Sequence, residues 1–221
     1  MSFEIGLLVV LLVVLVSLHS RRKRKAQLAF IESYPFNPAI GQKVKAKYPH
    51  LSDENVALVM DALREYFYFC HQAKRRVVSM PSQVVDVAWH EFILFTRDYQ
   101  QYCKKALGRF LHHTPTEAMS SPTKAQIGIK RAWRLACAKE GINPKTPAQL
   151  PLIFALDAQL GIDDGFKYSL NCKDKSSPLY GDSYCAGHIG CSSGCAGDSG
   201  GSSDSFGGDS SGCSSGCGGG D

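Results

Sequence analysis

Three histidines and a carboxylate near the middle of the chain have a spacing that can gather side chains around one metal ion. Asp86 and His90 are four residues apart, so on a helix both side chains lie on the same face. His112 and His113 follow Gly108, where the chain can turn back towards that helix. Imidazole and carboxylate groups suit zinc or another divalent transition metal. The sequence therefore predicts a metal site with the ligands Asp86, His90, His112 and His113.

A purely structural role explains the same four residues. Asp86 can orient His90 through a hydrogen bond, and the adjacent histidines can bond to the backbone around a tight turn. A pair at i and i+4 with a later doublet is also less specific than two Cys-x-x-Cys pairs. The spacing alone leaves both interpretations open.

The second group of candidate ligands lies in the last part of the chain, which is almost wholly Gly, Ser, Cys and Asp. The phrase Cys-Ser-Ser-Gly-Cys occurs there twice and supplies four thiols that could bind one soft metal ion: Cys191, Cys195, Cys213 and Cys217. The alternative is a flexible extension whose cysteines are incidental or palmitoylated. This composition buries too little apolar surface to offset the entropy of ordering the backbone, so we expect the tail to be disordered.

Two common catalytic patterns are absent from the sequence. Position 94 is Leu, so His90-Glu91 does not continue into the zincin helix, and no Gly-x-x-x-x-Gly-Lys phosphate loop occurs. Cys103 could act as a nucleophile beside His112 or His113, but a free cysteine is commonly buried and we expect Cys103 to face the core. The remaining enzymatic hypothesis is hydrolysis by a metal-bound water, with Glu91 or Glu117 as general base.

These side chains must be positioned by helices, because the central part of the chain has helical spacing of apolar residues and no marked strand alternation. Ser52-Asp53-Glu54 is a helix start, and the apolar face that follows extends to Cys70. We predict one long helix that opens at Pro81 and ends at Gly108. Three further helices are expected: a short one over 38–48, one over 123–140 that ends at Gly141, and one over 147–160 that ends at Gly161. The predicted class is mainly α.

The N-terminal segment predicts a single transmembrane helix. The aliphatic run from Ile5 to Leu18 is followed by five consecutive cations, Arg21 to Lys25. As a helix the run spans roughly 21–24 Å against a hydrocarbon core of roughly 30 Å, and local thinning with snorkelling of the cations closes the difference. The cations predict that the N-terminus is outside and the rest of the chain cytoplasmic. A buried core helix or an uncleaved export signal would explain the same run.

Composition divides the chain into four parts. These are an anchor (1–20), a basic juxtamembrane segment (21–33), a helical domain (34–170), and a linker with the Gly/Ser/Cys tail (171–221). In the cytoplasm the nine cysteines should be reduced thiols or metal ligands. The expected partners are the lipid bilayer and a protein bound through the domain or the tail. Nucleic acid is disfavoured, because no second basic block with interleaved aromatics accompanies the first.

The central segment VVDVAWHEFILFTRDYQQYCKKALGRFLHHTP resembles the motif of the glycine-rich domain-containing proteins. In that motif an Asp-x-x-Trp-His helix is followed by Leu, Tyr, Cys, Gly and His-His-x-Pro, and the matching residues here are Asp86, Trp89, His90, Leu94, Tyr99, Cys103, Gly108, His112, His113 and Pro115. Relatives have a further His shortly after the Trp-His pair, where this chain has Glu91-Phe92. The resemblance implies the family's helical domain and favours a histidine site, but it implies no reaction.

The sequence therefore predicts a membrane-anchored cytoplasmic helical module that binds a divalent metal or a protein partner. The alternative is a metal-dependent hydrolase with an Asp/His centre. Whether the chain is an enzyme is left open by its sequence.

Overall fold

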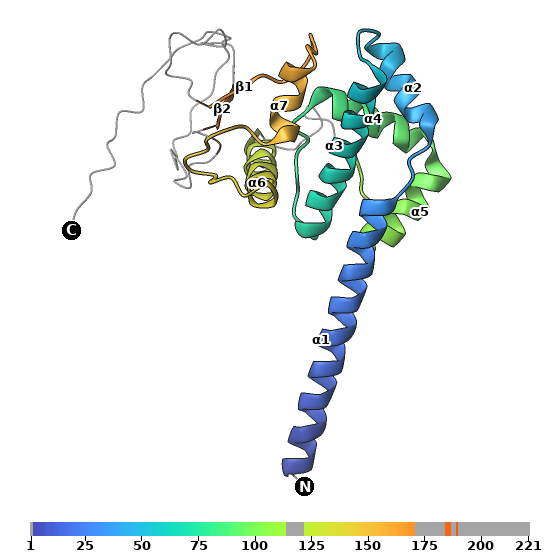
Figure 1. Cartoon of the computed structure of the whole chain (residues 1–221). Helices are drawn as coiled ribbons and strands as arrows, with labels where there is room; N and C mark the ends of the chain where they lie inside the picture. Colours follow the sequence, from blue (N-terminus) through green and yellow to red (C-terminus); the bar gives the residue numbers. More distant parts are fainter. Residues whose placement is uncertain (1, 114–121, 171–183, 187–188, 190–221) are drawn as a thin grey trace, which may run out of the picture. The chain divides into compact units, whose positions relative to one another are not determined.

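The computed structural model describes residues 2–113, 122–170, 184–186 and 189. Within this part the chain is mainly helical, as predicted, and its only strands form one short pair. The elements in chain order are α1 (Ser2–Ser33), α2 (Pro38–Lys47), α3 (Asp53–Gln72), α4 (Gln83–Leu94), α5 (Thr96–Leu107), α6 (Pro122–Glu140), α7 (Leu152–Gln159), β1 (Tyr168–Ser169) and β2 (Tyr184–Cys185) (Figure 1).

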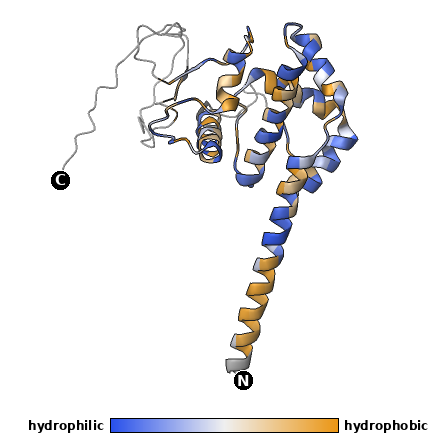
Figure 2. Ribbon diagram, viewed as in Figure 1, coloured by the Kyte–Doolittle hydropathy of each residue, from blue (hydrophilic) through white to orange (hydrophobic). Residues whose placement is uncertain are grey.

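Helix α1 is continuous from the predicted anchor through the basic segment. Its stretch Ile5–Ser33 is long and apolar enough to cross a membrane. Figure 2 shows the hydrophobic part giving way to a hydrophilic part before the helix reaches the other elements. The last turns pack against α3 and α5, where Ile31 is buried. Arg64 of α3 donates to the carbonyl oxygens of Ile31 and Tyr34, at 3.1 and 2.8 Å, and so satisfies carbonyls at the helix end.

Helix α3 contacts α1, α2, α4, α5, α6 and α7, and it therefore supplies the centre of the core. Its predicted start is confirmed: the Ser52 side chain caps the helix by accepting a hydrogen bond from the backbone N–H of Asn55 at 3.2 Å. The ring of Phe67 lies within 4.8 Å of Tyr102 and 6.0 Å of Phe92, measured between centroids. Tilted and edge-on pairs of this kind add to the burial that joins α3, α4 and α5.

The prediction of one helix from Pro81 to Gly108 is wrong, because the chain bends at Phe95. This residue has φ −79° and ψ 61°, and its N–H bonds back only to the carbonyl of Phe92. On a straight helix, residues 92 and 99 would be about 10 Å apart along the axis. The bend brings the rings of Phe92 and Tyr99 to 5.3 Å and buries both. Gly108 ends α5 with φ 68°, as its position suggested.

Helix α7 begins at Leu152, later than the predicted start at Pro147. Proline disfavours helical backbone in the preceding residue, so Pro151 prevents the helix from extending towards position 147. The carboxylate of Glu140 accepts a hydrogen bond from the N–H of Leu152 at 2.9 Å and caps the start of α7. Gly141, which follows α6, has φ 69° and marks the predicted end of that helix.

A short piece of the predicted disordered tail is folded. Strand β2 pairs in parallel with β1, with Tyr168 opposite Tyr184, and Ala186 and Ile189 are buried in the core. The remainder of the predicted tail lies outside the described residues.

Candidate metal centre

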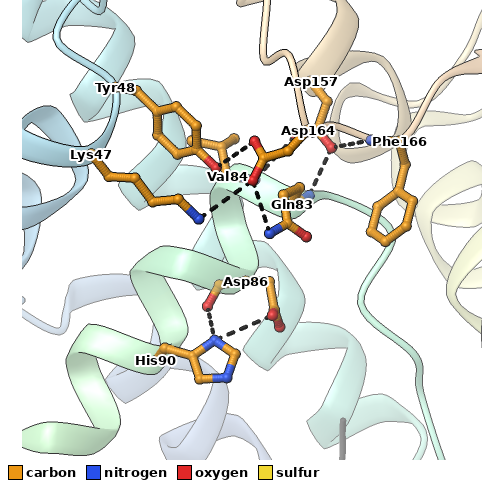
Figure 3. Close-up of polar contacts among 9 residues, drawn as sticks. All are labelled: Lys47, Tyr48, Gln83, Val84, Asp86, His90, Asp157, Asp164 and Phe166. Atoms are coloured by element: carbon orange, nitrogen blue, oxygen red, sulfur yellow. Dashed lines mark hydrogen bonds and ion pairs between the residues drawn. The ribbon is translucent and has the colours of Figure 1, made fainter. Parts of the chain in front are cut away.

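Helix α4 supplies the first two candidate ligands, and it places them as the spacing predicted. The Nδ1 atom of His90 lies 3.2 Å from a carboxylate oxygen of Asp86 and 2.9 Å from the Asp86 carbonyl oxygen (Figure 3). The start of α4 is fixed by the hydroxyl of Ser82, which accepts from the N–H of Val85 at 3.4 Å. The pair is thus built by local helix geometry on a capped helix.

His113 is the third candidate ligand, and it reaches the site because the chain turns back after Gly108. The Nε2 atom of His113 lies 3.0 Å from the other carboxylate oxygen of Asp86. The Trp89 indole N–H donates to the hydroxyl of Tyr99 at 3.1 Å, and that hydroxyl donates to the carbonyl of Leu111. This relay ties the returning segment to α4, and the His113 ring packs against Trp89 at 4.6 Å.

The three candidate ligands form a compact cluster at the surface of the fold. One ligand atom from each of Asp86, His90 and His113 lies within 4.8 Å of the others, and the two imidazole centroids are 4.0 Å apart. The exposed fractions of the side chains are 21% for Asp86, 50% for His90 and 14% for His113. The carboxylate is therefore shared by two imidazoles in a site that solvent can reach.

His112 is not brought into this cluster. Its side chain is exposed, and its ring lies 4.7 Å from the ring of Phe110 instead of facing Asp86. Of the four ligands predicted in the domain, the structure brings together Asp86, His90 and His113.

A pocket beside the cluster contains polar residues that the sequence patterns did not single out. It is lined by Lys47, Gln83, Asp86, Val87, His90 and Glu91. Lys47 forms an ion pair with Asp164 at 3.4 Å, and Asp164 also accepts from the hydroxyl of Tyr48 at 2.9 Å (Figure 3). No sequence signal links α2 to α4; only their packing brings Lys47 to the edge of the site. Glu91, the predicted general base, lines the same pocket, and Glu117 lies outside the described residues.

The cysteines of the domain are unsuited to nucleophilic chemistry. Cys70, Cys103 and Cys137 are free and buried. Burial raises the pKa of the Cys70 thiol to about 12 and that of Cys137 to about 11, and it also raises the pKa of Cys103. A thiol becomes nucleophilic only as a thiolate, so these groups are inert at neutral pH. The prediction that Cys103 faces the core is confirmed.

The tail thiols are mostly beyond what the structure describes. Cys191, Cys195, Cys213 and Cys217 lie outside the described residues. Cys185 is disulfide-bonded, so the expectation of reduced thiols or metal ligands is wrong at this position.

Comparison with known proteins gives one family match. No curated protein and no solved structure matches the chain. The model of the UCP032817-like family, whose name states no activity, matches residues 26–189. This range covers well over half of the chain and contains Asp86, His90 and His113. The chain therefore belongs to the UCP032817-like family.

Proposed function

We propose that this protein is a membrane-anchored helical module that binds one divalent transition metal ion, zinc in the first instance, through Asp86, His90 and His113. The observation that carries the proposal is the convergence of three candidate ligands, one carboxylate and two imidazoles, from two chain segments. Ligands bound tetrahedrally to zinc at about 2.05 Å are about 3.3 Å apart. The nitrogen-to-oxygen distances of 3.2 and 3.0 Å at Asp86 are within a few tenths of an ångström of that spacing.

The exposure of the site supports an open coordination position over a closed structural one. Structural zinc sites have four protein ligands, whereas catalytic sites have three and leave the fourth to water. Here three ligands converge, His90 is half exposed, and a pocket adjoins the cluster. A bound metal would therefore be accessible to water or to a ligand from a partner.

This openness also favours a second candidate, a metal-dependent hydrolase. Glu91 lines the pocket with Asp86 and His90, so its carboxylate could accept a proton from a metal-bound water, and Lys47 offers a positive charge at the same pocket. A panel of phosphate, carboxylate ester and peptide substrates tests this role. The expected result is turnover by the zinc-loaded wild type and retained zinc without turnover in Glu91→Gln. Equal turnover in both proteins would remove Glu91 from the proposal.

The metal proposal is tested by elemental analysis of the full chain purified in neutral detergent. The parent protein and all variants have Cys191, Cys195, Cys213 and Cys217 changed to Ser, so that no zinc is held by these tail thiols. We expect about one equivalent of zinc, lost in His90→Ala and in His113→Ala.

The neighbouring histidine gives the matched control. His112→Ala removes the same side chain one position away, where it is exposed and faces Phe110, so zinc content should not change. Circular dichroism on each variant checks that loss of zinc is not loss of fold. Zinc bound equally by all variants, or by none including the parent, would leave Asp86, His90 and His113 as a structural hydrogen-bonded cluster.

We further propose that α1 spans the bilayer with the domain and tail in the cytoplasm. The five cations after the apolar run favour this side, whereas the disulfide at Cys185 is a bond more typical of oxidising compartments. Protease protection of N-terminal and C-terminal tags in intact cells decides whether the domain lies inside or outside the cell. A C-terminal tag cleaved from outside the cell would reverse the proposed orientation.

The Gly/Ser/Cys tail is proposed as a flexible arm that binds a second metal ion or a protein partner. The resemblance to the glycine-rich domain-containing proteins supports a domain that carries such a tail, and the repeated Cys-Ser-Ser-Gly-Cys phrase supports thiolate ligation. Changing its four cysteines to Ser in the full chain should lower bound zinc from two equivalents to one. Unchanged zinc would refute thiolate ligation by the tail.

A further inference from the structure

Three segments of the chain are rich in cations and contain no acidic residue. These are 5–31, 66–85 and 99–116, which together have eleven Lys and Arg and no Asp or Glu. The cations are Arg21, Arg22, Lys23, Arg24, Lys25, Lys74, Arg75, Arg76, Lys104, Lys105 and Arg109, and we call them the basic face. In the sequence the first block alone stands out, because the other two have only three cations each and lie far from it along the chain.

The fold brings the three segments together around one level of α1. Arg24 donates to the side-chain oxygen of Gln72 at the end of α3, and Gln27 lies 3.2 Å from the ring of His71. Arg109, just after α5, donates to the carbonyl of Lys74 at 2.6 Å. The end of α3 and the end of α5 thus meet α1 where its basic turns begin to pack against the domain.

The basic face is largely exposed, and no carboxylate in the described part of the chain pairs with it. Its members are exposed except for Arg109, which is partly buried. None of them forms an ion pair among the described residues, although other cations of the domain do. The pKa of His71 is lowered by the burial of its ring and, secondarily, by the positive charge of Arg24. Uncompensated charge of one sign on this scale creates a field that attracts anions.

The turn that presents Lys74 is also unusual for its sequence. Lys74 has φ 59°, in the left-handed region that favours glycine. A lysine occupies the position although this backbone conformation is unfavourable for a residue with a Cβ, and the next two residues, Arg75 and Arg76, are exposed cations. The left-handed residue ends α3 and leaves three exposed cations in consecutive positions.

We propose that the basic face binds anionic phospholipid headgroups beside the point where α1 leaves the bilayer, an inference that rests on the proposed membrane span. Leu18 and Arg24 are six residues apart, which is about 9 Å along the helix. The headgroup layer extends roughly 5–8 Å beyond the hydrocarbon core on each side. The ends of α3 and α5 therefore lie at the outer edge of the headgroup layer, from which long lysine and arginine side chains reach the phosphate oxygens. The domain is thereby held against the bilayer in one orientation.

The test is native mass spectrometry of the full chain in neutral detergent micelles, dosed with equal amounts of phosphatidylserine and phosphatidylcholine. We expect the wild type to retain phosphatidylserine preferentially. In the triple variant Lys74→Gln, Arg75→Gln, Arg76→Gln the apparent affinity for phosphatidylserine should fall about 100-fold, or about fivefold per cation.

The matched control removes the same charge elsewhere in the fold. Lys43, Lys145 and Lys167 are exposed, and Lys43 lies on α2, which meets the start of α3 at Gly41 and Val56, not its end. Lys43→Gln, Lys145→Gln, Lys167→Gln should leave phosphatidylserine binding within about threefold of wild type. Equal losses in both triple variants would reduce the effect to net charge and overturn the basic face as a site.

Further outcomes distinguish this proposal from the membrane-span proposal and from a nucleic-acid-binding surface. Release of the wild type from cell membranes by alkaline carbonate would refute the membrane span itself, whatever the lipid preference. Retention in membranes without a preference for phosphatidylserine would overturn the basic face alone. A single-stranded oligonucleotide that binds the wild type and not the Lys74, Arg75, Arg76 variant, with no lipid preference, would identify a nucleic-acid surface and also overturn the proposal.

Discussion

Replacing Asp157 by alanine should release the start of α4, which holds the candidate metal centre in place. The Asp157 side chain on α7 is only 2% exposed. One of its oxygens accepts from the Ser82 hydroxyl at 2.7 Å and the Val84 N–H at 3.2 Å. The other accepts from the N–H groups of Gln83 and Phe166, at 2.7 and 2.8 Å (Figure 3). A single buried carboxylate therefore joins α7, the start of α4 and the loop that precedes β1.

The size of the effect follows from the donors left without an acceptor. Asp157→Ala leaves three backbone N–H groups unpaired, and a buried donor without a partner costs about 1–3 kcal/mol. We expect a loss of about 4 kcal/mol in the free energy of unfolding. Asp157→Asn keeps one oxygen, and its NH₂ can donate to the Ser82 hydroxyl, so the loss should be about 2 kcal/mol. For a chain of this size, 4 kcal/mol corresponds to a fall in Tm of roughly 12 °C.

The assay is thermal unfolding of the full chain in detergent micelles, followed by the fluorescence of Trp89 and Trp133, because both report on the domain and not on α1. Asp163→Ala is the control: it removes an exposed carboxylate nearby and should change stability by less than about 0.5 kcal/mol. Equal shifts for Asp157→Ala and Asp163→Ala would show that the network does not hold the fold. Zinc affinity should weaken in Asp157→Ala together with the Tm.

Further tests address the core of the domain. Burial raises the pKa of Glu65, so the folded state binds the Glu65 proton more tightly than the unfolded state does. The free energy of unfolding should therefore fall as pH rises above about 4.5, the pKa of the unfolded chain. Glu65→Gln should flatten this dependence in unfolding measurements at several pH values. A Cβ at Gly128 would lie 2.0 Å from the hydroxyl oxygen of Ser79, so Gly128→Ala should cost about 2 kcal/mol in denaturant unfolding despite better helix propensity. Peptide mapping after alkylation should find Cys70 and Cys137 modified only in denaturant, and labelling in the native state would contradict their burial.

The sequence by itself determined the elements whose signals are local. The apolar run and cations of α1, the Ser52 cap of α3 and the glycine after α5 each act within one or two helical turns. Asp86 and His90 were predictable for the same reason, since four residues of helix place them together whatever surrounds the helix.

Tertiary packing decided what these local signals could not. No residue near Phe95 is a helix breaker, and the bend exists because it buries the rings of Phe92 and Tyr99 against the same core. The ordered strand β2 likewise depends on pairing with β1, which its own composition does not predict.

The choice between His112 and His113 shows the same division at the site. Both residues are equally suited to bind metal and are adjacent in the sequence, so spacing cannot separate them. The bond from Tyr99 to the carbonyl of Leu111 fixes the turn, and the turn sends His113 to Asp86 and His112 to solvent. Local sequence thus set the helix that offers Asp86 and His90 as candidate ligands. Only the contacts of a distant segment with that helix decided which histidine meets them, because those contacts depend on how the whole chain packs.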